Sequence, residues 1–349
     1  MNKDNAPLRV IENKREFSLK RFFLQWEWML VALLIIINVV NIVSVGSSYG
    51  NYSSIMGALR DFMDKAILVF PMMMIILLGD IDVSVGSTIA LCATVMGTLF
   101  TKGVPMGLCL VIGVVLGALC GAFNGFLISR FKELSAVIVT VSTMIIFRGI
   151  ATVILRDQSA GGFPSWFTQI NWGGVAGIPF TVIFFVIEAV FFVILLSKSR
   201  FGRELYACGN NSETSRYSGI NTKRIKFLVF LIMGVFAAFS AIILMSKMSS
   251  ARPNIAKNYE LDVIAMVVLG GVATSGGKGK PLGVILSTLC ICFLRYGLGL
   301  NNITAETIMI IIGVLLIIAV AIPNLKAAFG GKRLKTGKKA AQPQSGAGA

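Results

Sequence analysis

Long apolar runs alternate with short polar segments along nearly the whole chain. A helix needs about 20 apolar residues to cross a bilayer, and several runs approach or reach that length. Their spacing predicts ten membrane segments, which are residues 28–45, 66–78, 87–100, 105–129, 135–155, 179–196, 227–245, 261–271, 281–300 and 303–322. The pattern therefore predicts an all-α membrane protein with about ten transmembrane helices.

Two of these segments, 66–78 and 261–271, are too short to cross alone, and each runs into glycine-rich sequence. Such backbone is tolerated at membrane depth only where protein or a water-filled cavity covers it, so we expect two broken or re-entrant elements. One pattern, Leu-Gly-x-x-x-x-Ser-x-Gly, occurs at both breaks. Its positions are Leu78, Gly79, Ser84 and Gly86, and then Leu269, Gly270, Ser275 and Gly277. Paired breaks of this kind point to a transporter's substrate path, and the order of crossings predicts parallel repeats.

Residues 52–65 follow a different pattern. Apolar side chains at Ile55, Met56, Leu59 and Phe62 alternate with charged ones at helical spacing. This spacing predicts an amphipathic helix lying on the membrane surface.

Composition supports a membrane protein. Hydrophobic residues make up 56% of the 349, the mean hydropathy is +0.82, and only 14% are charged, against roughly 25% in soluble domains. A net charge of +16 is also typical of nucleic-acid binding, but the positive side chains lie beside apolar spans, where they orient membrane proteins. We therefore expect membrane lipid and no nucleic acid as a partner.

The charge distribution predicts the orientation. If the N-terminus is cytoplasmic and every segment crosses, the inner pieces hold roughly three times as many Lys and Arg as the outer ones. Both termini are then cytoplasmic. We expect a cytoplasmic segment at 1–27, a transmembrane domain at 28–323 with a cytoplasmic loop at 198–226, and a basic, disordered tail at 324–349.

Catalytic chemistry is poorly represented. The chain has no histidine, which removes the commonest general base and metal ligand. Its six cysteines form no CxxC pair and are expected to pack in the interior. The sequence GGKGK at 276–280 lacks the spacing of a Walker A motif. We therefore expect no enzyme activity, no nucleotide site and no metal.

Charged residues inside apolar segments are functional candidates because they are costly in a bilayer. Glu188 either lines a path, pairs with a residue such as Arg148, or is a protonated acid bonded to a neighbouring helix. Asp80 and Asp82 either cap the half-helix that follows the first break or line the path.

The polar stretch 200–226 is the second informative feature. Asn211 or Ser212 can cap a short helix, which Gly219 would end in the left-handed conformation. Glu213 and Arg216 lie three residues apart and share a face of that helix. Such an element suits docking to a cytoplasmic protein, and the alternative is a basic loop held at anionic lipid.

Three blocks of sequence resemble a known family. LLGDIDVSVGS, FGRELYACGNNSETSRYSGI and YELDVIAMVVLGGVATSGGKGKPLG are similar to blocks of the permease subunits of bacterial ABC importers for ribose, xylose, arabinose and related sugars. AFNGFLISRF and MIIFRG also resemble that family. The chain departs from its usual pattern at Ser135-Ala136, at Val141-Ser142 and near Tyr296.

The resemblance implies a permease in the bacterial inner membrane that moves a monosaccharide or related furanosyl solute. Its partners would be a second permease chain, a cytoplasmic ATPase dimer that binds the ATP, and a periplasmic or extracellular sugar-binding protein. The ATPase would contact Gly202, Arg203, Glu213, Arg216, Ser218 and Gly219. The path would be lined by the two broken segments and the intramembrane acids, that is by Asp80, Asp82, Ser84, Gly86, Glu188, Gly270, Gly271, Ser275 and Gly277. The alternative is an ion-coupled secondary transporter of a small polar solute, with Glu188, Asp80 and Asp82 as its coupling acids.

Overall fold

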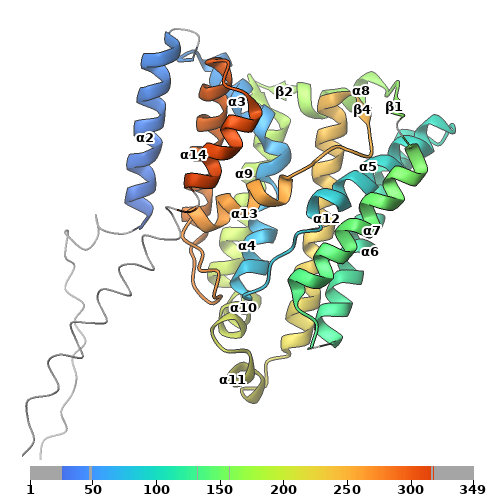
Figure 1. Cartoon of the computed structure of the whole chain (residues 1–349), viewed down its shortest axis with the longest axis vertical. Helices are drawn as coiled ribbons and strands as arrows, with labels where there is room; N and C mark the ends of the chain where they lie inside the picture. The colour runs from blue at the N-terminus through green and yellow to red at the C-terminus, as the bar shows by residue number, and fades with distance from the viewer. Residues whose placement is uncertain (1–25, 47–48, 132, 157, 316, 318–349) are drawn as a thin grey trace, which may run out of the picture.

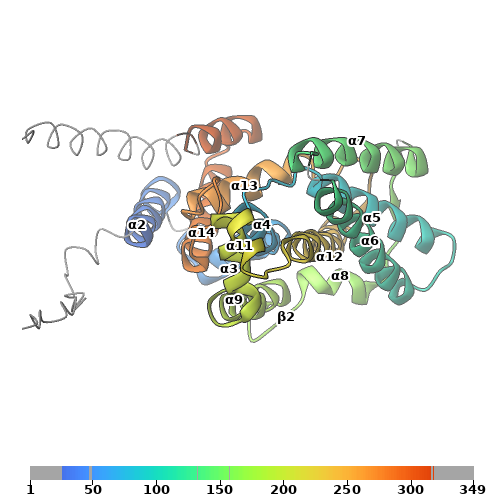
Figure 2. The same cartoon turned by 90° about the horizontal axis from the view of Figure 1, so that it is seen from below.

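The computed structural model describes residues 26–46, 49–131, 133–156, 158–315 and 317. Six of its helices are long and apolar enough to cross a membrane. They are α2 (Trp26–Val45), α6 (Met106–Arg130), α7 (Ala136–Leu155), α9 (Phe180–Lys198), α12 (Thr222–Met248) and α14 (Pro281–Leu300). These helices stand roughly side by side in Figure 1, and the view from below shows a bundle with α7 and α9 on opposite sides (Figure 2). The protein is therefore a multi-pass α-helical membrane protein.

The first broken element begins with α3 (Tyr52–Ala66) and continues almost directly into α4 (Val69–Leu77). The predicted helix at 52–65 is confirmed, but its predicted position on the membrane surface is wrong, since the second half of α3 is buried through Phe62, Met63 and Asp64. The following residues 80–84 carry no regular secondary structure. They rise back into the bundle, where α5 (Val85–Thr101) starts at mid-height (Figure 1).

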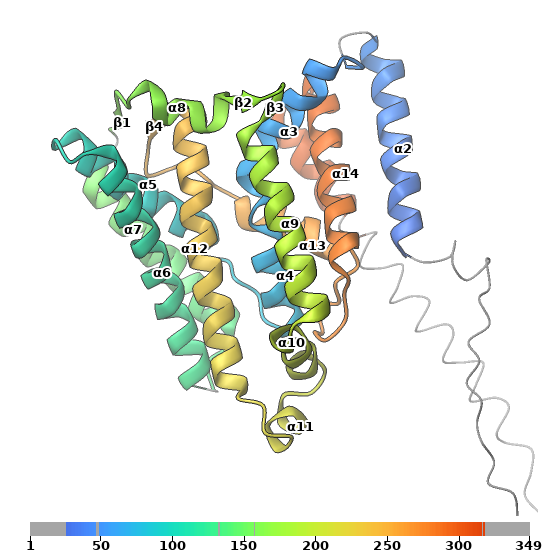
Figure 3. The same ribbon diagram turned by 180° about the vertical axis from the view of Figure 1, so that it is seen from behind.

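The second broken element has the same parts in the opposite direction. α12 runs to the far end of the bundle, residues 252–258 return toward its middle, and α13 (Tyr259–Leu269) starts there (Figures 1 and 3). In the first element, α3–α4 is followed by irregular residues 80–84 and then by α5, which begins at mid-height. In the second, α12 is followed by irregular residues 252–258 and then by α13, which also begins at mid-height. These two sets of elements are related in an inverted sense, because the matching elements point in opposite directions (Figure 1). The predicted parallel repeat concerned other features, the glycine motifs that follow α4 and α13.

Small residues allow the closest helix contact in the bundle. α6 carries Gly113, Gly117, Gly121 and Gly125 at four-residue intervals. A Cβ on Gly117 or Gly121 would overlap the backbone of Gly234 in α12. Glycine spacing of this type lets two helix backbones approach directly, which fixes α6 against α12.

The two ends of the bundle are built differently. At one end, α8 (Ser165–Trp172) lies beside two short strand pairs. Strand β1 (Ala160–Gly161) pairs antiparallel with β4 (Ser250–Ala251), and β2 (Gly174–Val175) pairs with β3 (Ile178–Pro179). At the other end, α10 (Arg200–Asn210) and α11 (Ser212–Tyr217) project below the long helices (Figure 3).

The core is concentrated on α4, where every residue is buried. Phe70 stacks on Phe185 and Phe192 of α9, with ring centroids 6.0 and 5.4 Å apart. All six cysteines are free and buried, which confirms the predicted packing role. Of the final predicted span, 303–322, the structure describes a helix at Ala305–Leu315. Residues 1–25 of the predicted segment 1–27 and the whole predicted tail 324–349 lie outside the described residues.

Candidate functional site

The starts of α5 and α13 meet in the middle of the bundle. A Cβ on Gly86 would lie 2.5 Å from the carbonyl oxygen of Ala256, 2.5 Å from Oε2 of Glu260 and 3.6 Å from Nη2 of Arg148. Figure 2, seen along the bundle, places α13 between α5 and α14. Glycine at position 86 is therefore required for the two half-helices to approach.

Asp82 fixes the start of α5. Its Oδ1 accepts hydrogen bonds from the backbone N–H of Ser84 at 2.8 Å and from the Ser84 hydroxyl at 2.7 Å. Asn124 of α6 donates to Ser84 Oγ at 2.9 Å. Asp82 is only 3% exposed, so its carboxylate holds Ser84, the residue that precedes α5, from inside the bundle.

Arg148 holds the second irregular segment. Its guanidinium donates to the carbonyl oxygens of Pro253 at 2.9 Å and Ile255 at 2.7 Å. Backbone carbonyls in an irregular segment need such partners at membrane depth. The contact therefore stabilises the chain just before α13.

Glu188 does not pair with Arg148. It is 4% exposed in α9, and neither of its carboxyl oxygens has a hydrogen-bond partner among the described residues. A buried polar group without a hydrogen bond is costly, so Glu188 is an unsatisfied polar group inside the described part of the bundle.

The two glycine breaks pack against each other at the α10 end. The backbone N–H of Gly277 donates to the carbonyl oxygen of Leu77 at 2.8 Å. A Cβ on Gly209 of α10 would overlap that same Leu77 oxygen and approach Gly277. Gly276 adopts a φ of +84°, which a side chain would strain. We call Leu77, Gly79, Gly209, Gly276 and Gly277 the glycine knot.

Tyr206 adds a side-chain bond to the glycine knot. Its hydroxyl donates to the carbonyl oxygen of Gly279 at 2.8 Å. Burial raises the pKa of this phenol, so the hydroxyl keeps its proton and remains a donor at neutral pH. α10 is thus bonded to the loop that follows α13.

The other glycines of the second break also lie at this end. A Cβ on Gly270 would meet Gly283 and Val284 of α14, and one on Gly271 would lie 2.7 Å from the Trp26 ring. Trp26 Nε1 donates to the carbonyl oxygen of Leu269 at 2.8 Å. Gly270, Gly271, Ser275 and Gly277 therefore lie where the loop after α13 packs, whereas Ser84 and Gly86 lie at the mid-height junction.

The loop singled out at 198–226 forms two short helices with side-chain caps. Ser199 Oγ accepts from the N–H of Gly202 at 3.0 Å, and Asn211 Oδ1 accepts from the N–H of Thr214 at 2.9 Å. Glu213 and Arg216 form the expected pair at 3.2 Å. Gly219, with a φ of +81°, ends α11 as predicted. The remaining members of the set are Arg203, which donates to the Lys198 carbonyl, and Ser218, which donates to the Thr214 carbonyl.

Asp80 is bonded to the start of α12. Its Oδ2 lies 2.7 Å from Nζ of Lys226, and these residues are 146 positions apart in sequence. Lys226 belongs to the first turns of α12, directly after α11. The ion pair therefore joins the α11 region to the irregular segment 80–84.

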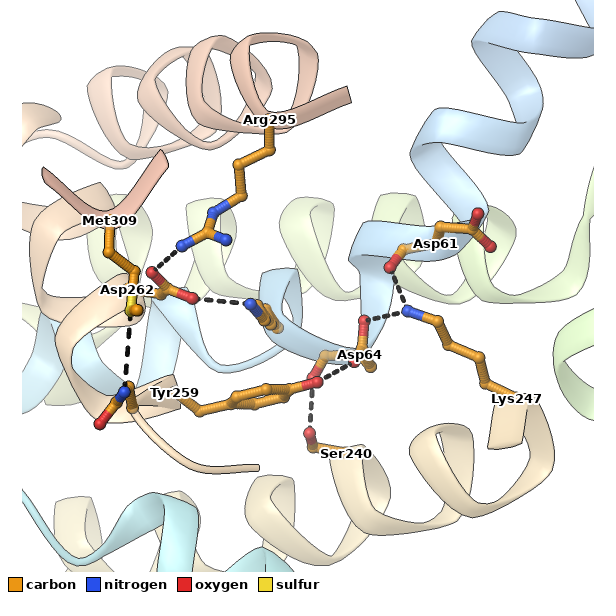
Figure 4. Close-up of polar contacts among 10 residues, drawn as sticks. Asp61, Asp64, Ser240, Lys247, Tyr259, Asp262, Arg295 and Met309 are labelled. Atoms are coloured by element: carbon orange, nitrogen blue, oxygen red, sulfur yellow. Dashed lines mark hydrogen bonds and ion pairs between the residues drawn. The ribbon is translucent and has the colours of Figure 1, made fainter. Parts of the chain in front are cut away.

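A buried ionic network near the starting point of α13 was not predicted from the sequence (Figure 4). The Tyr259 hydroxyl donates to Oδ2 of Asp64 at 2.5 Å, and Ser240 donates to the Asp64 carbonyl at 2.5 Å. Asp262 accepts from Lys65 at 2.6 Å and also from Arg295. The network links α3, α12, α13 and α14. Its only sequence signal was the presence of charges within predicted apolar segments.

Comparison with known proteins identifies the family. Residues 54–320 match the family model described as "Branched-chain amino acid transport system / permease component". The chain is 32% identical over 301 residues to the Autoinducer 2 import system permease protein LsrD of Salmonella typhimurium (strain LT2), covering 84% of this chain and 90% of that protein. It is also 32% identical to the protein of that name from Escherichia coli (strain K12 / DH10B), covering 91% of its length. No solved structure matches significantly.

These matches cover both broken elements, the glycine knot and the α10–α11 region. They confirm the resemblance that the three sequence blocks indicated and decide against the ion-driven alternative, because permeases of this family are driven by a separate ATPase that binds the ATP. They also imply an ATPase and a solute-binding protein as partners. The chain belongs to the family of integral-membrane permease subunits of bacterial ATP-binding-cassette importers.

Proposed function

We propose that this permease imports a monosaccharide or a related furanosyl solute across the bacterial inner membrane. The support is the likeness to the LsrD proteins, which are named for autoinducer 2 import, together with the sugar-importer blocks in the sequence. The description of the family model names branched-chain amino acids. We favour the sugar-like class because the relatives align over most of the chain.

The proposed topology has ten crossings and cytoplasmic termini. The end of the bundle with α10 and α11 carries a dense set of basic side chains, and cytoplasmic loops are enriched in Lys and Arg. They are Arg130, Lys198, Arg200, Arg203, Arg216, Lys223, Arg224, Lys226, Lys278 and Lys280. On this assignment the β1–β4 end faces outward.

The proposed coupling mechanism rests on one observation: contacts join α10 and the start of α12 to both glycine breaks, the one after α4 and the one after α13. Gly209 and Tyr206 contact the second break, and Lys226 pairs with Asp80 at the first. An ATPase that displaces α11 would therefore move both broken elements together. We propose Gly202, Arg203, Glu213, Arg216, Ser218 and Gly219 as its docking residues.

The proposed path runs along the junction of α5 and α13. Ser84 and Gly86 lie at that junction, and Asp80 and Asp82 set the position of the segment leading to it. Gly270, Gly271, Ser275 and Gly277 act at its cytoplasmic end, and Glu188 contributes a buried carboxyl group from α9. The proposed assembly includes a second permease chain, identical or paralogous, which measurement of the purified mass would reveal.

The substrate class is tested by competition. The permease is reconstituted with its ATPase and binding protein, and ATP-dependent uptake of labelled ribose and of labelled autoinducer 2 is measured with unlabelled leucine as competitor. We expect uptake of at least one furanosyl compound and no competition by leucine. In a parallel assay with labelled leucine, ATP-dependent uptake of leucine without uptake of either furanosyl compound would refute the proposed class.

A further inference from the structure

A polar cavity opens where the end of α7 faces the residues after β4. Its volume is about 500 Å³. Its wall includes Arg148, Thr152, Arg156, Arg252, Asn254 and Lys257. On the proposed topology this cavity, the basic pocket, faces the outside of the membrane.

The charge of the basic pocket is one-sided. Four of its lining side chains are cationic, and no Asp or Glu lines it among the described residues. Arg156, Arg252 and Lys257 are exposed and form no ion pair within the described part of the chain. Arg148 lies close to Glu260, but the like charges of the other three side chains repel one another, so this part of the pocket is complementary to an anion.

The other cations at this end have structural partners. Arg60 pairs with Asp61 at 3.3 Å, Lys65 with Asp262 at 2.6 Å and Lys247 with Asp64 at 3.6 Å. Lys102 is the remaining one at this end within the described residues. The outer loops of membrane proteins are ordinarily poor in Lys and Arg. Most of the outer cations that have no ion pair among the described residues therefore lie at one cavity.

The basic pocket is connected to the mid-height junction through Arg148. Its guanidinium is fixed by the carbonyl oxygens of Pro253 and Ile255. The same guanidinium lies beside Gly86, close to Glu260. Arg148 therefore contacts both the pocket and the junction of α5 and α13.

We propose that the basic pocket binds a small solute that carries a carboxylate or a phosphate on a hydroxylated, sugar-like frame. The inference rests on the proposed function and narrows its substrate class. The volume falls within the range of roughly 300–1,000 Å³ for small-molecule sites. A recessed cavity with a fixed guanidinium in its wall favours a small solute over an extended protein surface.

The test uses the complete importer in lipid nanodiscs and two matched pairs of labelled probes. The pairs are D-galacturonate with D-galactose, and ribose 5-phosphate with ribose, each differing by one anionic group. Binding is measured at low and high salt on the wild type, on the double variant R252Q/K257Q, and on K102Q as the control. Lys102 is an outer cation outside the pocket, so its loss changes net charge without changing the site.

We expect the anionic member of at least one pair to bind about tenfold or more tightly than its neutral partner, because charge-assisted bonds are strong. The double variant should abolish that difference, salt should weaken it, and K102Q should retain it. Equal binding within both pairs would overturn the proposal. Loss of binding-protein affinity in the double variant, with no preference for anions, would also overturn it and assign the pocket to acidic side chains of that protein. If only the proposed function is wrong, the importer will bind the anionic probes but show no ATP-dependent uptake of furanosyl compounds. The two proposals can therefore fail separately.

Discussion

Lys226 Nζ lies 2.7 Å from Oδ2 of Asp80, and this contact joins the helix that follows α11 to the first break in the bundle. Both side chains are partly shielded from solvent, with exposures of 27% and 14%. The pair lies between the proposed ATPase-docking region and the proposed path. Substitutions at these two residues therefore test directly whether movement of the docking region is transmitted to the path.

The first prediction concerns this ion pair. Asp80→Lys or Lys226→Asp alone places like charges together and should weaken the coupling of ATP hydrolysis to transport. Mutations along coupling networks change it by about 0.5–2 kcal/mol, or roughly 2- to 30-fold. The swapped double variant D80K/K226D should recover much of the loss. Uptake per ATP hydrolysed is the measurement, and a double variant no better than the worse single variant would count against the pair.

The second prediction concerns the glycine knot. Gly209→Ala introduces a Cβ that overlaps the Leu77 carbonyl oxygen, and overpacking of this kind costs about 1–3 kcal/mol. We expect a lower thermal midpoint and disturbed coupling. Gly57→Ala is the matched control, since a Cβ there meets no atom within 4 Å. Equal midpoints for the two variants would show that α10 does not pack on the break as described.

The third prediction concerns the buried ionic network. Tyr259→Phe removes the hydroxyl that donates to Asp64, and an unsatisfied buried acceptor costs about 1–3 kcal/mol. Tyr52→Phe is the control, because Tyr52 is 57% exposed. Thermal unfolding in detergent compares the two. A destabilisation by Tyr52→Phe as large as that by Tyr259→Phe would contradict the role assigned to Tyr259.

The fourth prediction concerns the cap of α11. Asn211→Ala removes the side chain that accepts from Thr214, which destabilises a helix start by about 0.5–2 kcal/mol. We expect weaker copurification of the ATPase with an intact permease. Asn51→Ala is the control, since Asn51 precedes α3 without a side-chain cap bond. ATPase recovery that is unchanged in Asn211→Ala would count against docking at α11.

The sequence predicted the parts of the fold that local pattern determines. Helix spacing located the long spans, and glycines located the ends of α4 and α13. The side-chain cap at Asn211 and the left-handed conformation of Gly219 could also be predicted from the sequence, because both depend on neighbouring residues alone.

The errors concern contacts between distant segments. The amphipathic pattern of residues 52–65 arises in part because Asp64 and Lys65 belong to the buried ionic network. Periodicity alone cannot distinguish a polar helix face that enters such a network from one that contacts water. The repeat was predicted to be parallel because the order of crossings has both copies of the glycine motif enter from the outside. The inverted relationship involves irregular residues 80–84 and 252–258, whose sequences share no obvious pattern. Pairing of Lys226 with Asp80 likewise depends on tertiary structure.

We propose that this permease transports its solute only when a separate ATPase drives it through the α10–α12 region. The most direct measurement is uptake of the solute carried by the cognate binding protein into proteoliposomes that contain the permease. We expect uptake when the ATPase and ATP are present, and no uptake when only a proton or sodium gradient is imposed on the permease alone. Uptake by the permease alone under an ion gradient would contradict it.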